Sequence, residues 1–137
     1  MRLSAFLSHH LGDGAMLVRI ETALGSTPRE AGATMAVSAQ GTAGTIGGGQ
    51  LEFHCIDIAR SMLTGGERVR SLDIPLGPQM GQCCGGRVQV SLRRAMRADL
   101  AMQAGHEKAE AAARPAVLIF GAGHTGRALA QALALLP

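Results

Sequence analysis

Two adjacent cysteines, Cys83 and Cys84, have the clearest chemical potential in the sequence. They precede Gly85 and Gly86 in a segment, 76–86, that shows neither helical nor strand periodicity. Such a glycine-rich segment is typical of a loop, and loops often carry binding residues. Adjacent thiols pair poorly in a disulfide, so the pair favours a soft-metal site, a sulfur-transfer step or a covalent adduct. The structural alternative is a turn with small, buried cysteines.

The two thiols are expected to play different roles. Adjacent side chains of an extended segment point to opposite sides, so one thiol should face a ligand while the other packs inward. Cys84 is favoured for the ligand because Gly85 and Gly86 leave space beside it. Arg87 follows directly, and its charge can hold a neighbouring thiolate, the form that binds metal or takes up sulfur.

A second candidate site is the run of Gly47, Gly48 and Gly49, which opens a helix predicted over 50–63. Free N–H groups and the helix dipole favour an anion such as a phosphate there. Arg29, in a polar loop two strands earlier, can supply a bidentate contact to the same anion. The alternatives are a plain glycine helix cap and an exposed loop arginine.

A third candidate is the dinucleotide fingerprint formed by Gly121, Gly123 and Gly126. It follows an apolar run at 116–120, which is typical of a strand buried on both faces, and a helical pattern comes after it. The acidic residue that should bind the ribose would lie about 20 residues on, beyond Pro137. We therefore expect a fragment of a Rossmann unit rather than a strand added to the preceding sheet, and NAD(P) binding by this chain alone is not expected.

The elements that must position these residues follow from periodicity. Apolar alternation predicts five strands, at 16–24, 34–38, 42–46, 69–74 and 87–92. Helical spacing predicts a short helix at 3–11, the helix at 50–63 and a linking helix at 96–114. One face of the second helix carries Leu51, Cys55, Ile58 and Met62, so Cys55 is interpreted as structural.

The predicted fold class is α/β. A mixed sheet of about five strands, with the 50–63 helix packed on it, should form an N-terminal domain at 1–95. The linker helix at 96–114 should lead to a truncated Rossmann-like start at 115–137, with its 116–120 strand exposed on both faces. Such an apolar surface favours association of chains, so a homo-oligomer remains open.

Composition limits the classes of function. The 137 residues are 47% hydrophobic, enough for a core, and carry a net charge of +3. Aromatic residues make up only 2% and no Lys/Arg-rich block occurs, which argues against nucleic-acid binding. No apolar run reaches membrane-spanning length and no signal peptide is recognisable. Three cysteines do not form a disulfide framework, and the cytoplasm is the expected location.

Four motifs occur in order along the chain, in the segments 25–32, 44–52, 77–86 and 117–124. Together they resemble the XdhC/CoxI family of xanthine dehydrogenase accessory proteins, from near residue 15 to the end. Family members continue into a whole Rossmann domain, whereas this sequence stops after the first strand and helix of one.

The resemblance implies a chaperone of the molybdenum cofactor (molybdopterin). Such proteins bind the cofactor, assist its sulfuration by a cysteine desulfurase and deliver it to a molybdenum hydroxylase such as xanthine dehydrogenase. The cofactor offers a phosphate for Arg29 and the 47–49 turn, and a metal with dithiolene sulfurs for Cys83 and Cys84. Which group meets which residue stays open.

Two other functions compete with this one. An NAD(P)-dependent oxidoreductase would use the glycine fingerprint, but its substrate half would be missing here. An interaction domain with a structural metal would normally need four ligands, and only two thiols are adjacent. His9, His10 and His54 show no metal-ligand spacing relative to the thiols.

Overall fold

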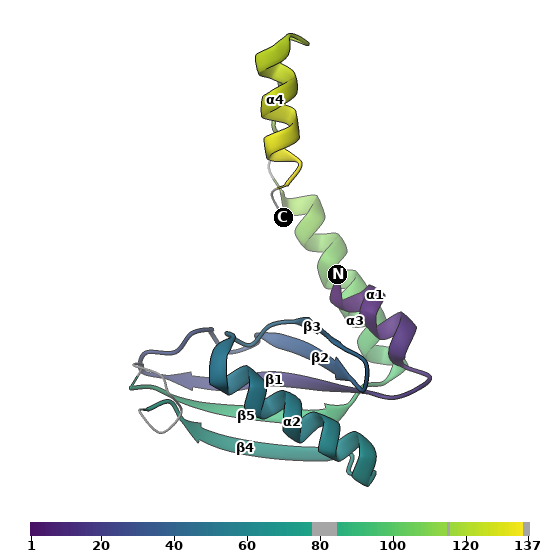
Figure 1. The fold of residues 1–137 in the computed structure, drawn as a ribbon, viewed down its shortest axis with the longest axis vertical. Coiled ribbons are helices and arrows are strands. Elements are labelled where there is room, and N and C mark those ends of the chain that lie inside the picture. The colour runs from purple at the N-terminus through teal and green to yellow at the C-terminus, as the bar shows by residue number, and fades with distance from the viewer. Residues whose placement is uncertain (78–84, 115, 136–137) are drawn as a thin grey trace.

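The computed structural model describes residues 1–77, 85–114 and 116–135, so Cys83 and Cys84 lie outside the described residues. A five-stranded sheet of order β3-β2-β1-β5-β4 forms the centre of the fold (Figure 1). Its strands are β1 (Ala15–Leu24), β2 (Thr34–Ser38), β3 (Thr42–Gly44), β4 (Val69–Pro75) and β5 (Arg87–Arg94). With its helices, the sheet confirms the predicted α/β class.

All pairings in this sheet are antiparallel, whereas a mixed sheet was expected. Parallel neighbours require a crossover connection between them. The one long crossover within the sheet runs from β3 through α2 (Gly49–Gly65) to β4, and these strands form opposite edges. The crossover therefore creates no parallel neighbours.

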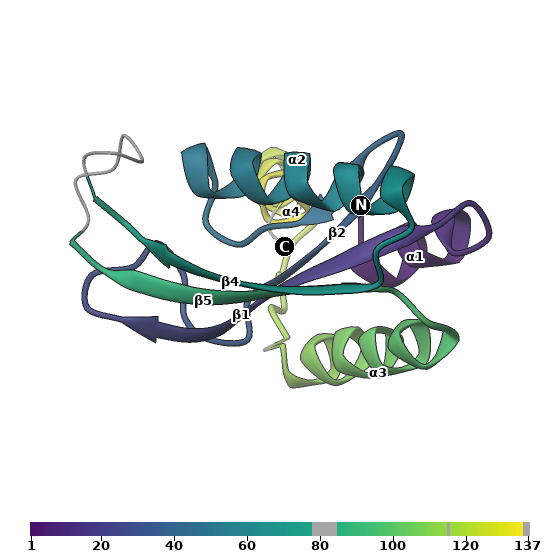
Figure 2. The same cartoon turned by 90° about the horizontal axis from the view of Figure 1, so that it is seen from below.

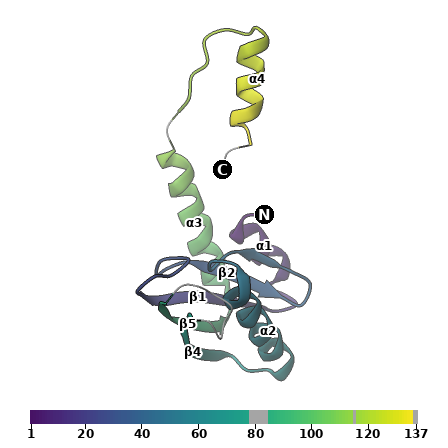
Figure 3. The ribbon, with the colours of Figure 1, turned by 60° about the vertical axis from the view of Figure 1, so that its left-hand side comes forward.

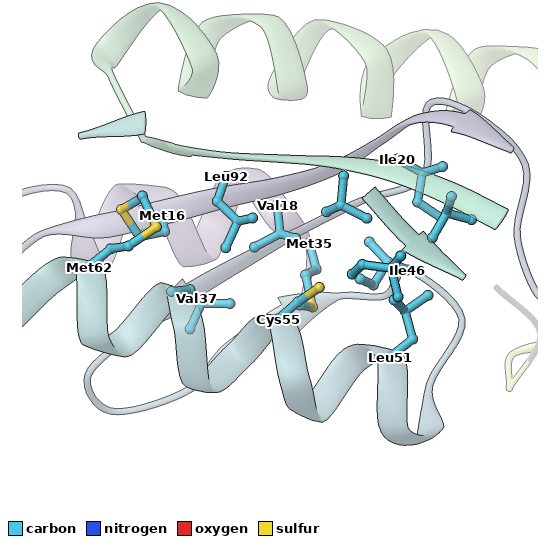
Figure 4. Packing of buried hydrophobic residues seen from close by; sticks show 14 of the residues in the cluster. Met16, Val18, Ile20, Met35, Val37, Ile46, Leu51, Cys55, Met62 and Leu92 are labelled. Carbon is cyan, nitrogen blue, oxygen red and sulfur yellow. The ribbon is translucent and has the colours of Figure 1, made fainter. Parts of the chain in front are cut away.

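The helix α2 covers one face of the sheet (Figure 2). Its buried side chains meet the apolar face of the strands in a continuous core (Figure 4). From α2 the core takes Leu51, Cys55, Ala59 and Met62. Cys55 is fully buried, and burial, followed by the nearby Glu52 charge, raises its pKa to about 12. Its predicted structural role is confirmed.

The opposite face is covered at one end by α1 (Leu3–His10) and α3 (Arg97–Ala113). Phe6 and Leu7 of α1 pack there against Leu17 of β1. Glu107 of α3 joins the two helices, because its carboxylate accepts hydrogen bonds from the backbone N–H and the hydroxyl of Ser4, at 3.0 and 2.5 Å. The predicted linking helix therefore exists, and its first part packs on the sheet.

The C-terminal segment contains α4 (His124–Leu133), which stands apart from the sheet (Figures 1 and 3). Residues 116–120 form no strand, contrary to the prediction. A buried strand needs neighbours for its backbone groups, and the described residues provide none. Val117, Leu118 and Phe120 are 64%, 77% and 94% exposed, as expected for an apolar segment without its partners. The domain boundaries remain a prediction.

Candidate functional site

Two connections of the chain start side by side at one end of the sheet. Leu24 ends β1 and pairs with Arg87, which begins β5, while Pro75 ends β4 and pairs with the same arginine. Beyond these pairs, the N–H of Leu76 donates to the carbonyl of Gly86 at 2.7 Å. The loop after β1 and the connection that carries the two thiols therefore start from the same end of the sheet.

Gly86 is the contact point between these two connections. A Cβ placed on Gly86 would lie 2.2 Å from the carbonyl oxygen of Ser26 and 2.8 Å from that of Leu24. Only glycine allows so close an approach of two backbones. The space that the sequence predicts beside Cys84 is thus filled at Gly86, whereas at Gly85 no described atom lies within 4 Å of a built Cβ.

The glycine turn before α2 contacts the same loop after β1, in the part of that loop that carries Arg29. Gly47 has a φ of +128°, and a Cβ there would lie 2.7 Å from Cγ of Pro28 and 3.6 Å from Cγ of Arg29. The aliphatic stem of Arg29 therefore lies against the glycine turn. An open hollow of about 580 Å³ is lined by Arg29 and its loop neighbours.

Glu52 binds backbone N–H groups at and just before the glycine turn. Its Oε2 accepts hydrogen bonds from the N–H of Ile46 at 3.1 Å, the N–H of Gly48 at 3.0 Å and the hydroxyl of Thr45 at 2.6 Å. Glu52 thus takes the Gly48 donor of the turn that was predicted to hold a ligand phosphate, and the hydroxyl of Thr45 accepts from the N–H of Gly47 at 3.1 Å. The acidic residue in the first helical turn was visible in the sequence, but its reach back to Ile46 was not.

We expect Glu52→Ala to lower the free energy of unfolding by about 2 kcal/mol, because it leaves two partly buried N–H donors without their charged acceptor. Urea denaturation measures the change. Glu52→Gln is the matched control: it keeps one acceptor oxygen, so its loss should be smaller. Equal stability of wild type and Glu52→Ala would show that these hydrogen bonds do not hold the turn.

Arg87 is paired with Asp73 in a bidentate contact. Its Nε and terminal nitrogen each lie 2.6 Å from one carboxylate oxygen. The hydrogen bond from Arg87 lowers the pKa of Asp73, and both side chains are about half exposed. The guanidinium that was expected to hold a neighbouring thiolate is therefore paired with Asp73, and Cys83 and Cys84 lie outside the described residues.

The glycine fingerprint lies apart from the loops at this end of the sheet. Gly121 has a φ of +117°, and a Cβ on Gly126 would lie 2.3 Å from the Gly121 carbonyl oxygen, so the tight turn of the motif is present. Gly123 precedes α4, which stands away from the sheet (Figure 3). The fold therefore brings together Arg29, the 47–49 turn and the base of the thiol loop, but not Gly121, Gly123 and Gly126.

In 1–77, 85–114 and 116–135, no group of three or more His, Cys, Asp and Glu residues is placed to hold a metal ion. Among the helices of these same ranges, none is long and apolar enough to cross a membrane.

The geometry defines an α/β domain whose candidate site is built by loops at one end of an antiparallel sheet. Residues 9–73, just under half of the chain, match the model of the XdhC and CoxI family. The family resemblance predicted from the sequence is thereby confirmed over this segment.

The fold is also similar to that of a solved protein. The crystal structure of a xanthine dehydrogenase from Bacillus halodurans superposes with a TM-score of 0.61 at 20% sequence identity. The match covers 75% of this chain and 33% of that chain, so the chain spans about a third of the length of that protein. A comparison with curated proteins finds no match.

Proposed function

We propose that this chain belongs to a molybdenum-cofactor chaperone that assists cofactor sulfuration and insertion into xanthine dehydrogenase or a related molybdenum hydroxylase. The family match supports an accessory role at a coarse level. The observation that carries the finer proposal is the meeting of the Arg29 loop, the 47–49 turn and Gly86 at one end of the sheet. The partners of this function are the hydroxylase and a cysteine desulfurase, and its location is the cytoplasm.

The residues at this end fit the phosphate of the cofactor in part. Arg29 lines an open hollow and forms no ion pair with any residue that the structure describes, so its guanidinium is available to an anion. Glu52 already binds the N–H groups of Ile46 and Gly48. A phosphate would therefore use Arg29 and the donors from Gly49 onward, since oxygens of an anion suit both a guanidinium and a helix start.

The thiols fit the soft end of the cofactor by their chemistry. Thiolates bind soft metals and take part in sulfur exchange, which are the two properties that sulfuration requires. The bound cofactor would supply the molybdenum and its dithiolene sulfurs. The chain would supply the orientation, through the backbone contact of Gly86 with Ser26 at the base of the loop.

We expect one of the two single replacements Cys83→Ser and Cys84→Ser to abolish cofactor transfer to an apo-hydroxylase while the protein stays folded. Serine keeps the size of the side chain and removes the soft donor. The other replacement should mainly lower stability. Transfer is measured as hydroxylase activity regained, together with molybdenum and pterin bound to the purified chain.

Cys55→Ala is the matched control because Cys55 is buried in the core, where its thiol does not reach a ligand. It should lower stability and leave transfer by the folded fraction unchanged. Wild-type transfer rates for both serine variants, with normal metal content, would make the loop structural and remove the thiols from the proposal.

A further inference from the structure

Arginines gather at the end of the sheet opposite the candidate site. We call this the arginine surface and define it by Arg68, Val69, Arg94, Met96 and Arg97. The N–H of Arg94 donates to the carbonyl of Arg68 at 2.9 Å, so the two residues lie side by side at the start of β4 and the end of β5. A hollow of about 440 Å³ opens there, lined by Arg68, Val69, Arg93, Arg94, Ala95 and Met96.

The fold accounts for two of the arginines in this region. Arg93 is paired with Asp99, at 2.8 and 2.5 Å. The guanidinium of Arg94 lies over Gly14, where a built Cβ would come within 2.8 Å of it, beside Leu63 near the C-terminal end of α2. A cation is favourable at that end of a helix.

The fold does not account for the rest of the surface. Arg68 and Arg97 are exposed and form no ion pair with a described residue. Arg97 is the first residue of α3, where the helix dipole disfavours a positive charge. Val69 and Met96 are 65% and 58% exposed beside them. Two apolar side chains are thus exposed beside arginines that have no ion-pair partner among the described residues.

We propose that the arginine surface docks a protein partner that presents acidic side chains around an apolar one. Arginine and methionine are enriched in protein interfaces, and arginine pairs bidentately with carboxylates. Two carboxylates beside this surface, those of Asp99 and Glu67, are already bound by Arg93 and Arg70, so the positive charge calls for an acidic partner. The surface has no aromatic side chain on which bases could stack, which favours a protein over nucleic acid.

The surface and the candidate site lie at opposite ends of β4 and β5. A partner bound at the arginine surface would leave the loops around Gly86 free. Docking there is therefore independent of the cofactor function proposed above, and the two can fail separately.

The test uses the full chain, labelled with ¹⁵N, and three synthetic peptides: one with leucine flanked by glutamates, one with serine in place of leucine, and one with lysines in place of glutamates. We expect the first peptide to shift the amide signals of 68–69 and 93–97, and the other two to bind at least about tenfold more weakly. The double variant Arg68→Glu with Arg97→Glu should weaken the first peptide by about tenfold or more.

Arg127→Glu is the matched control, since Arg127 is exposed on α4 and away from this surface. It should bind the peptide as the wild type does. The proposal is overturned if the leucine peptide leaves these signals unchanged, if the serine peptide binds equally well, or if a single-stranded oligonucleotide shifts the same signals at lower concentration.

Discussion

Gly86→Ala should be the most damaging single change at the candidate site, and we expect it to lower the free energy of unfolding by about 3 kcal/mol. A Cβ at this position would lie 2.2 Å from the carbonyl oxygen of Ser26, and this neighbour is backbone rather than a movable side chain. Either the loop after β1 or the start of β5 must shift. The hydrogen bond from Leu76 to Gly86 should weaken with it.

Gly85→Ala is a control of the same chemistry one residue away. A Cβ on Gly85 meets no described atom within 4 Å, so this change should leave stability within about 0.5 kcal/mol of wild type. Urea denaturation compares the two variants, and hydrogen exchange of the Leu76 amide reports the local opening. Equal stability of the two variants would refute the close contact between Gly86 and Ser26.

Asp99→Ala should have the second large effect. Asp99 is 3% exposed, and its carboxylate accepts hydrogen bonds from Arg93 and from the N–H of Met96 at 2.8 Å. Its removal leaves a partly buried guanidinium unpaired and the first turn of α3 without its acidic acceptor. We expect a loss of about 3 kcal/mol, the lower end of what breaking a buried pair costs.

The same pair predicts a pH dependence. The hydrogen bonds from Arg93, ahead of the opposing effect of burial, lower the pKa of Asp99. A lowered pKa in the folded state means that the stabilisation is complete above the unfolded value of about 3.9 and is lost as the pH falls through the folded value. The stability difference between wild type and Asp99→Ala should therefore shrink on acidification below about pH 4.

Asp73→Ala is the control for Asp99→Ala, because Asp73 makes a similar bidentate pair with Arg87 on the exposed side of the sheet. Surface pairs are worth little, so this change should cost less than about 1 kcal/mol. Urea denaturation across pH 2–7 measures both variants. A difference for Asp99→Ala that stays constant through this range would contradict the assigned role of its charge.

The sequence by itself determined the elements whose periodicity is local. Alternating apolar residues predicted the strands of the sheet, and the spacing of Leu51, Cys55 and Met62 predicted the buried face of α2. Both patterns are set by burial on one face, which acts along a single segment. The family resemblance likewise came from motifs that can be read in order along the chain, and residues 9–73 confirm it.

The tertiary structure decided what depends on residues far apart in the chain. The contact of Gly86 with Ser26 arises because the end of β1 and the start of β5 are neighbours at one end of the sheet, and no local pattern encodes which backbone comes close. Glu52 binds the N–H groups of Ile46 and Gly48 because the chain folds back from Ile46 onto the first turn of α2. The run at 116–120 has the sequence of a buried strand but forms none, because a strand requires neighbours that supply its hydrogen bonds, and the described residues contain no such neighbours.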